Sequence, residues 1–435
     1  MFGIVFIAFG ILFVAMLFFV AYATNGREVF SPPMIFCIFV FVYVFLRTIY
    51  MFYVVDFSEY EAPVDETILG YGFIAMTFAI VSYCAGYLYV GKGYIKLYRP
   101  EFSIKGNLAY YVLIAVALLG LLFYFRYMGV LDNPLRPFVS RYFITDGNQR
   151  SSLTFLAMGA DVLYVIFLFR LAQVKKLSRL KPYEYMLILI PIFTNIVTTN
   201  RGTIILYIFG VLCVTYSLRN FKFPYLKFLA FVITIVGTLG VVRGVTQSEE
   251  QVQAVDIEYV AVLSQTIEHI MERPYHIAID KTSFIISEVS ERNLYLHGES
   301  LISFIFAPIP RIFWADKPSV TIGPWVAKVV YSRENRSGVP PGLIAELFLN
   351  FSWPGIIIGM FFYGVICRVL YNTHKRFTDT SLAWRVFYSI FLISFIFRIL
   401  GADFSGAAIF FLRLFVPFFL ILTLTKSHKP TAHSE

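Results

Sequence analysis

Residues 300–355 read SLISFIFAPIPRIFWADKPSVTIGPWVAKVVYSRENRSGVPPGLIAELFLNFSWPG, and this stretch decides the fold. It combines prolines, tryptophans and basic residues, and it then passes directly into a long apolar run. It is the second part of 247–342, the longest polar interruption in a chain made mostly of hydrophobic runs. We therefore expect a large loop that folds over one mouth of a bundle of membrane helices and carries the chemistry.

The composition of the whole chain is typical of a membrane protein. Of its 435 residues, 58% are hydrophobic and only 14% are charged, and the mean hydropathy is +0.73. Soluble proteins average about 25% charged residues. A helix needs about 20 apolar residues to cross the hydrocarbon core of a bilayer. The sequence therefore predicts an all-α polytopic membrane protein.

Eleven apolar runs are candidates for transmembrane helices. They are 2–22, 33–54, 67–90, 107–125, 153–172, 185–199, 203–218, 225–245, 343–371, 385–400 and 406–425. This pattern predicts three regions: eight spans with short loops in 1–246, the large loop in 247–342, and three spans with a short tail in 343–435. The first run is expected to stay as a span, because it lacks the basic segment that precedes a signal peptide's apolar core.

Basic residues predict the orientation, because they favour the cytoplasmic side of a membrane. With eleven spans, the basic loops at 92–105, 175–181, 219–227 and 375–385 all fall on one side, together with the C-terminus. We therefore expect a periplasmic N-terminus, a cytoplasmic C-terminus and a periplasmic large loop. The net charge of +9 is explained by these loops and by anionic headgroups, so it does not indicate nucleic acid.

The large loop has two halves of different character. By count, about ten acidic and three basic residues lie in 247–299, against two acidic and five basic in 300–342. Apolar spacing in the first half predicts helices over 258–272 and 275–290. Six prolines in the second half exclude a long regular helix. After the loop, Gly355 and Gly359 form a GxxxG pattern that is typical of helix packing.

No common catalytic or metal-binding motif is present. Nucleotide-binding glycine loops, HExxH and G-x-S-x-G are absent from the sequence, and the four cysteines all lie inside apolar runs. Because ATP is absent outside the cytoplasm, a reaction there needs a substrate that was activated beforehand, such as a lipid-linked pyrophosphate. Such a substrate calls for cations to hold the leaving group and for a base.

Cations are available near the expected outer ends of the spans. They are Arg201, Arg243, Arg311, Lys317 and Arg398, with Arg141 on an outer loop. Guanidinium groups bind phosphate oxygens through two parallel hydrogen bonds. The alternative is that each side chain extends to the headgroups or to water. The sequence TTNRGT at 198–203 further predicts a tight turn or a re-entrant dip at Arg201.

Acidic residues and a histidine near the same mouth are candidates for the base. Glu346 opens the span after the loop, and the others are Asp316, Glu299, His297 and Asp403. For Glu346 the alternative is a favourable interaction with the helix dipole. His297 lies in YLHGES at 295–300, a pattern more typical of a turn than of a site.

Three motif blocks resemble the Wzy-type O-antigen polymerases, the family of oligosaccharide repeat-unit polymerases. They are YLHGES at 295–300, PIPRIFWADKP at 308–318, and 338–355 with Glu346, Asn350 and Phe351. The pattern of many spans with one large outer loop is also similar. The resemblance implies a GT-C-like helical bundle in the bacterial inner membrane.

The resemblance also implies an activity. Such enzymes transfer a growing glycan from undecaprenyl pyrophosphate to the sugar of another lipid-linked repeat unit on the periplasmic face. It implies no cofactor and no metal. The expected partners are the lipid-linked donor and acceptor, the bilayer and a chain-length regulator of the same membrane. On this basis Glu346, Arg311, Lys317 and Asp316 are candidate catalytic residues.

The remaining candidate residues are expected to bind substrate, and two other functions stay open. The expected substrate-binding residues are Arg201, Arg243, Arg141, Arg398, His297, Glu299 and Trp314. One alternative is an O-antigen ligase, which relies on a loop histidine and transfers the finished glycan to the lipid A core. The other is a flippase of lipid-linked oligosaccharides, which a loop of this length disfavours.

Overall fold

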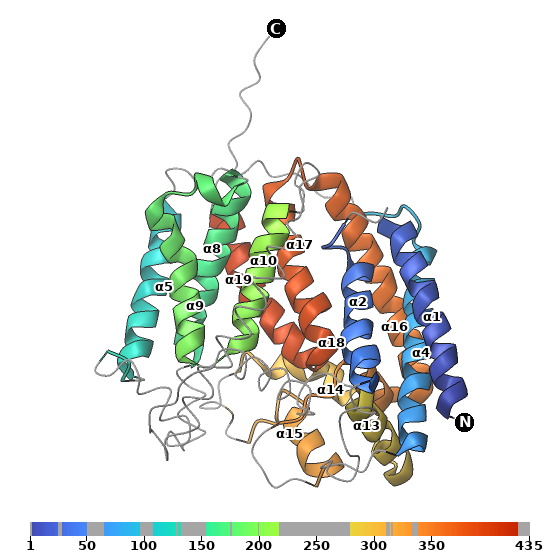
Figure 1. Cartoon of the computed structure of the whole chain (residues 1–435). Coiled ribbons are helices and arrows are strands. Elements are labelled where there is room, and N and C mark those ends of the chain that lie inside the picture. Colours follow the sequence, from blue (N-terminus) through green and yellow to red (C-terminus); the bar gives the residue numbers. More distant parts are fainter. Residues whose placement is uncertain are drawn as a thin grey trace, which may run out of the picture. The chain divides into compact units, whose positions relative to one another are not determined.

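In the computed structural model, the described residues form helices joined by turns and irregular segments, and they contain no strand (Figure 1). The described residues are 2–24, 28–49, 65–95, 108–127, 129–131, 154–174, 176–198, 200–216, 279–309, 314, 316–332 and 338–424. The chain divides into two compact units, Met1–Ser103 with Pro274–Glu435, and Ile104–Arg273. Each unit is described by itself.

The first unit contains most of the long helices and all described parts of the large loop. Four of its helices are α1 Phe2–Thr24, α4 Glu66–Tyr89, α16 Leu343–Phe377 and α19 Phe404–Leu424. Helix α2, Pro32–Val40, continues as a π-helix over Phe41–Leu46. Helix α17, Leu382–Leu392, continues as a π-helix over Ile393–Arg398 and then as α18, Ile399–Gly401. The described loop elements are α13 Ile279–Arg292, α14 Glu299–Ile302, a 3-10 turn Ser303–Phe306, and α15 Gly323–Trp325 with a wide turn Val326–Val330. In Figure 1, α13, α14 and α15 gather at the lower end of this unit.

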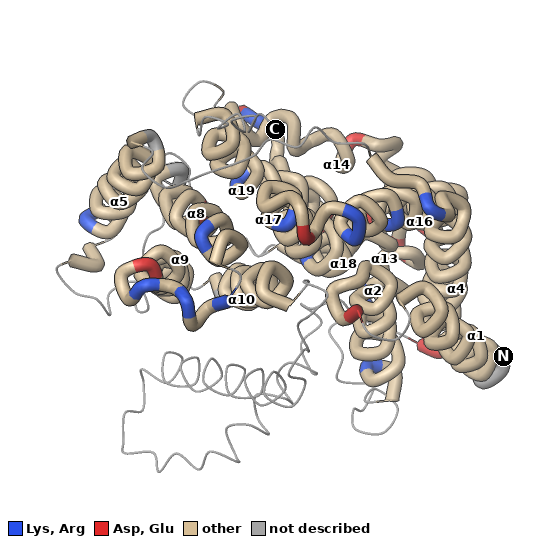
Figure 2. The backbone as a smooth tube through the Cα atoms, turned by 90° about the horizontal axis from the view of Figure 1, so that it is seen from above, with Lys and Arg blue, Asp and Glu red and all other residues tan. Residues whose placement is uncertain are grey.

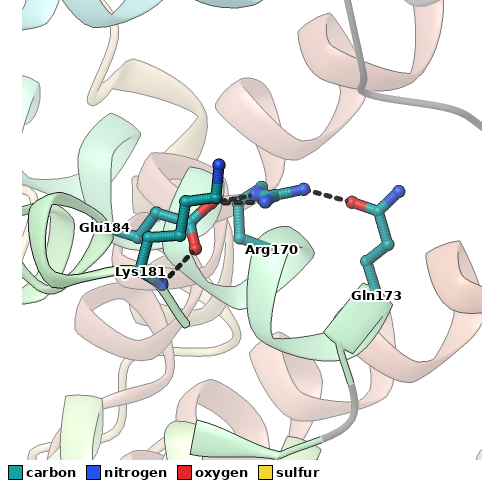
Figure 3. A network of polar contacts seen from close by, with 4 residues as sticks. All are labelled: Arg170, Gln173, Lys181 and Glu184. Atoms are coloured by element: carbon teal, nitrogen blue, oxygen red, sulfur yellow. Dashed lines mark hydrogen bonds and ion pairs between the residues drawn. The ribbon is translucent and has the colours of Figure 1, made fainter. Parts of the chain in front are cut away.

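The described part of the second unit contains four helices. They are α5 Leu108–Tyr127, α8 Met158–Val174 after a 3-10 turn Thr154–Ala157, α9 Met186–Val197 after the turns Leu177–Arg179 and Pro182–Tyr185, and α10 Arg201–Tyr216. Figure 3 shows how α8 is tied to the turn before α9: Arg170 pairs with the buried carboxylate of Glu184 and also donates to Gln173. Glu184 in turn accepts from the backbone amide of Lys181.

Seven described helices are long and apolar enough to cross a membrane. They are Phe6–Thr24, Pro32–Ile49, Glu66–Tyr89, Tyr110–Tyr127, Leu343–Phe377, Leu382–Gly401 and Phe404–Leu424. Charged residues are sparse along them, as Figure 2 shows. These helices fit a polytopic α-helical membrane protein.

The count of eleven spans stays a prediction. The expected runs at 185–199 and 203–218 fall on short apolar helices, and 153–172 falls on α8, which has 17 residues. The expected run at 225–245 lies outside the described residues. The division of the chain at 247 and 342 and the periplasmic position of the loop also stay predictions.

Helices α4 and α16 form the tightest contact in the first unit. A Cβ atom placed on Gly86 would lie 2.0 Å from the carbonyl oxygen of Phe361, and one on Gly364 would lie 2.3 Å from that of Tyr83. Small residues allow the backbones of membrane helices to approach closely. The two helices run parallel, because the backbone at Gly91 and Gly93, after α4, accepts hydrogen bonds from Asn372 near the end of α16.

Replacing Gly86 by Ala is expected to destabilise the protein. The added methyl group meets backbone rather than a flexible side chain, and overpacking of this kind typically costs about 1–3 kcal/mol. The matched control is Gly70→Ala on the same helix, where a Cβ atom meets nothing within 4 Å. That control is expected to be neutral or to stabilise by up to about 1 kcal/mol. Thermal unfolding of the purified variants measures both, and equal midpoints for the two would contradict the contact.

One end of this unit gathers basic side chains. Arg368 donates to the carbonyl oxygen of Gly91 over 3.0 Å, Lys375 pairs with Glu28 at 2.9 Å, and the guanidinium of Arg376 lies 4.2 Å from the Tyr94 ring centroid. The segment after α4 therefore lies beside the C-terminal end of α16. The assignment of this end to the cytoplasm stays a prediction.

Candidate functional site

A sharp kink in α16 lies at the end of the first unit where the described loop elements gather, and we call this end the mouth. Phe351 and Ser352 leave the helical conformation, with φ of −140° and +57°, just before Pro354. Proline has no N–H to bond the carbonyl of Asn350, which favours a break here. The backbone amide of Leu296 instead reaches the neighbouring Leu349 carbonyl, at 3.0 Å. The expected span at 343–371 is therefore a helix in two parts, joined to the large loop at the break.

The two parts of α16 fold back onto each other. A Cβ atom on Gly355 would lie 2.3 Å from the carbonyl oxygen of Leu347, and one on Gly359 would lie 2.5 Å from the Leu347 side chain. In a continuous helix these residues would be two to three turns apart. The GxxxG pattern thus packs against the first part of its own helix, and all eight residues of that part, 343–350, are buried.

Glu346 lies in this first part and is fully buried. One carboxylate oxygen accepts from the hydroxyl of Ser300 at 2.7 Å, and the other accepts from the backbone amide of Phe404 at 2.6 Å. Ser300 belongs to α14 of the loop, and Phe404 is the first residue of α19. A single carboxylate therefore joins the loop, the kinked helix and the last span.

Asn350 extends this network by one turn. Its amide nitrogen donates to the Ser300 hydroxyl at 2.7 Å and to the Glu346 carbonyl at 2.8 Å. Its amide oxygen accepts from the backbone of Gly298 at 2.9 Å. With these contacts the side chain of Asn350 has no spare donor, and it holds the turn before α14 against the kink.

The start of α19 completes the site. Asp403 accepts from the amide of Gly406 at 3.0 Å, as residues at a helix N-terminus often do, and its second oxygen accepts from Ile322 of the loop at 2.8 Å. The hydroxyl of Ser405 donates to the carbonyl of Ser300 at 2.7 Å, and it lies 2.8 Å from the hydroxyl of Ser303. We call Ser300, Glu346, Asn350, Asp403 and Ser405 the mouth network.

The predicted turn at YLHGES is confirmed. His297 and Gly298 both adopt the left-handed conformation, with φ of +49° and +98°, and the His297 side chain is exposed. Gly298 is also close to the kink, since a Cβ atom there would lie 3.1 Å from the Phe351 ring. Glu299 and Asp316 are exposed as well, so neither is part of the mouth network.

The basic second half of the loop, 300–342, is described in part. The ammonium group of Lys317 is largely buried and donates to the carbonyls of Ile309 at 2.9 Å and Ala307 at 3.3 Å. Trp314 is 36% exposed and packs edge-on against Phe306, with ring centroids 5.5 Å apart. Arg311 lies outside the described residues. Lys317 therefore stabilises the turn around Pro308 through these two hydrogen bonds.

The other predicted cations have different positions. The guanidinium of Arg398 lies 4.8 Å from the ring centroid of Phe410 on α19. Arg201 is the first residue of α10, after a tight turn in which the amide of Asn200 donates to Asn195. That outcome confirms the predicted turn, whereas the Arg201 side chain, Arg141 and Arg243 lie outside the description.

A second buried ionic cluster was not predicted from the sequence. Arg47, at the end of the second span, pairs with Asp280 of α13 at 2.9 Å, and both side chains are at most 5% exposed. The adjacent Lys281 is buried and donates to the carbonyl of Pro340. Burial lowers the pKa of Lys281 to about 8, and the charge of Asp280 offsets part of that effect. An arginine inside an apolar run was the available signal, because such residues usually have a partner.

The burial of Lys281 predicts a pH dependence. Its pKa is about 8 in the folded protein and about 10.4 in an unfolded chain, so the unfolded chain holds the proton more tightly. The free energy of unfolding therefore rises as the pH increases from about 8 to about 10. Chemical unfolding at about pH 7.5 and about pH 9.5 should show a gain on the order of 1–2 kcal/mol over Lys281→Met. An equal response of both proteins would contradict this interpretation.

The mouth network contains two carboxylates, a side-chain type that is capable of acid–base chemistry. Among the described residues, no group of three or more His, Cys, Asp or Glu side chains could hold a metal ion. The structure brings Glu346 and Asp403 to one mouth, next to the loop that carries Lys317. The sequence did not single out Ser300 and Ser405 as site candidates, and both contribute hydrogen bonds to the mouth network.

Comparisons with known proteins add no family assignment. Neither the protein-family models, nor the curated proteins, nor the solved structures gave a match to this chain.

Proposed function

We propose that the protein polymerises undecaprenyl-pyrophosphate-linked oligosaccharide repeat units into O-antigen or a related surface polysaccharide. The proposal is that the glycan of one lipid-linked chain passes to a sugar hydroxyl of another on the periplasmic face of the bacterial inner membrane. The observation that carries it is the mouth network: two of the three motif blocks that resemble the Wzy-type polymerases, at 295–300 and 338–355, meet at Glu346.

The reaction needs a leaving group held in place and a proton removed. The acceptor hydroxyl oxygen forms a bond to the anomeric carbon, the bond from that carbon to the pyrophosphate oxygen breaks, and the electron pair leaves with the pyrophosphate. In the proposal, Arg311 and the other basic residues of 300–342 bind the pyrophosphate, because fixed cations stabilise the charge that develops in a transition state. Glu346 is the proposed acceptor of the hydroxyl proton.

The hydrogen bonds of Glu346 leave its carboxylate able to accept a further proton. Each of its oxygens accepts one hydrogen bond from the protein, and a carboxylate oxygen has room for about two. Glu346 can therefore keep its contacts to Ser300 and Phe404 while it accepts a proton. Asp403 is the second acid of the mouth, and each of its oxygens likewise accepts one hydrogen bond, from a backbone amide.

Two other functions are distinguished by one assay. The purified protein in liposomes is given two lipid-linked repeat units, one of them labelled. A ladder of longer glycans supports a polymerase. Transfer only to added lipid A core indicates a ligase, for which His269, His276 and His297 are the loop histidines, and no covalent change indicates a flippase. Arg311→Ala should abolish the ladder, and Arg311→Lys should recover little of it because a point charge cannot replace the guanidinium fork.

A further inference from the structure

The segment Glu299–Ile309 has its polar side turned inward. Ser300 is 5% exposed and bonded to Glu346, and Ser303 bonds the carbonyl of Val320 at 2.7 Å and lies against Ser405. Phe304 packs on Phe404, with ring centroids 5.9 Å apart. This inner side is therefore fixed to the kinked helix and to the start of α19.

The opposite side of the same segment begins with the exposed Glu299 and is otherwise apolar and open. Ile302 is 55% exposed, Ile305 is 60% exposed and Ile309 is 38% exposed. Residues spaced by three and four lie on one side of a helical turn. The segment thus has its serines inside and its isoleucines outside, which is the reverse of a segment that faces water.

The part of α16 next to the turn that precedes this segment also exposes apolar side chains. The turn at Gly298 touches Phe351, which is itself 48% exposed at the head of the long part of α16. That part of α16 then presents Ile357, Ile358 and Phe362, each at least 41% exposed. In a helix that crosses a membrane, such side chains face lipid.

We infer that Glu299–Ile309 is an interfacial ledge, whose isoleucine side lies in the boundary between headgroups and acyl chains of the lipid leaflet. One further feature fits this depth. Trp314 stands beside the ledge at 36% exposure and packs against Phe306, and tryptophan favours the membrane interface.

Depth-dependent quenching tests the ledge and does not depend on the proposed function. Full-length protein with Ile305→Cys is labelled with an environment-sensitive fluorophore and reconstituted in phosphatidylcholine vesicles. The control is Glu291→Cys on α13, which is exposed next to charged neighbours. The native cysteines Cys37, Cys213 and Cys367 are buried, and the protein without the new cysteine corrects for labelling of Cys84.

The two positions are expected to respond in opposite ways. Phospholipids with a shallow acyl-chain spin label should quench position 305 several-fold more than position 291, and aqueous iodide should quench 291 more than 305. Quenching of 305 by iodide alone would overturn the inference, since the ledge would then face water. Protection of 305 from both quenchers would also overturn it, because a second copy of the chain or another protein would then cover the ledge. Ile302→Cys repeats the measurement if the first variant does not fold.

Discussion

Replacing Glu346 by Gln is expected to lower polymer formation by at least about 10²-fold, the usual contribution of a general base. The substitution keeps the size of the side chain and removes its negative charge. The variant should still insert and fold, because a glutamine can accept from the Phe404 amide. Ladder length and initial rate in the liposome assay measure the effect.

A structural cost of the same substitution must be separated from a chemical one. The Ser300 hydroxyl donates to Glu346 and accepts from Asn350. If residue 346 becomes a donor, that hydroxyl receives two donors and loses its acceptor, at a cost of about 1–3 kcal/mol. The single variant Ser300→Ala is the matched structural control, because it removes the hydroxyl that bonds both side chains and keeps the carboxylate. Loss of the ladder in Glu346→Gln alone supports the base, whereas an equal loss in Ser300→Ala would show that Glu346 is a positioning residue.

Replacing Asp280 by Ala is expected to cost about 3–5 kcal/mol of folding free energy, because it leaves a buried arginine without this carboxylate. Arg47 and Asp280 are both deeply buried, so water cannot replace the lost partner. The loss should appear as a lower thermal midpoint of the protein in detergent and as less protein in the membrane.

Two controls define this effect. The double variant Arg47→Met with Asp280→Leu removes both charges, and such exchanges are often neutral or stabilising. Glu28→Ala breaks the half-exposed pair with Lys375, which should cost at most about 1 kcal/mol. A loss at Asp280 no larger than that at Glu28 would show that the buried pair contributes little.

The helices of the fold were largely predictable from the sequence. The runs at 67–90 and 406–425 correspond to α4 at Glu66–Tyr89 and α19 at Phe404–Leu424. They were predictable because length and hydropathy are local properties of the chain. The expected helix at 275–290 is confirmed from residue 279 onward as α13, Ile279–Arg292, whereas the expected helix at 258–272 lies outside the described residues. Only short helical turns follow α13 in the described part of the proline-rich half.

The candidate site was less predictable because it depends on contacts between distant residues. Glu346 stood out by its place before a span, but the contacts with Ser300 and Phe404 cross 46 and 58 residues of sequence. Pro354 was a visible sign of a break, whereas the return of Leu347 onto Gly355 depends on the conformation of Phe351 and Ser352. Local patterns do not determine such contacts.

The position of Phe404 at the mouth has a consequence for the order in which the protein matures. A chain is synthesised from its N-terminus, so Ser300 and Glu346 leave the ribosome well before α19 does. Until α19 is in place, the carboxylate of Glu346 lacks the Phe404 amide, and Ser300 lacks the Ser405 hydroxyl. The mouth network is therefore complete only when the last described helix is in place, and a nascent chain that stops short of residue 404 lacks these two contacts.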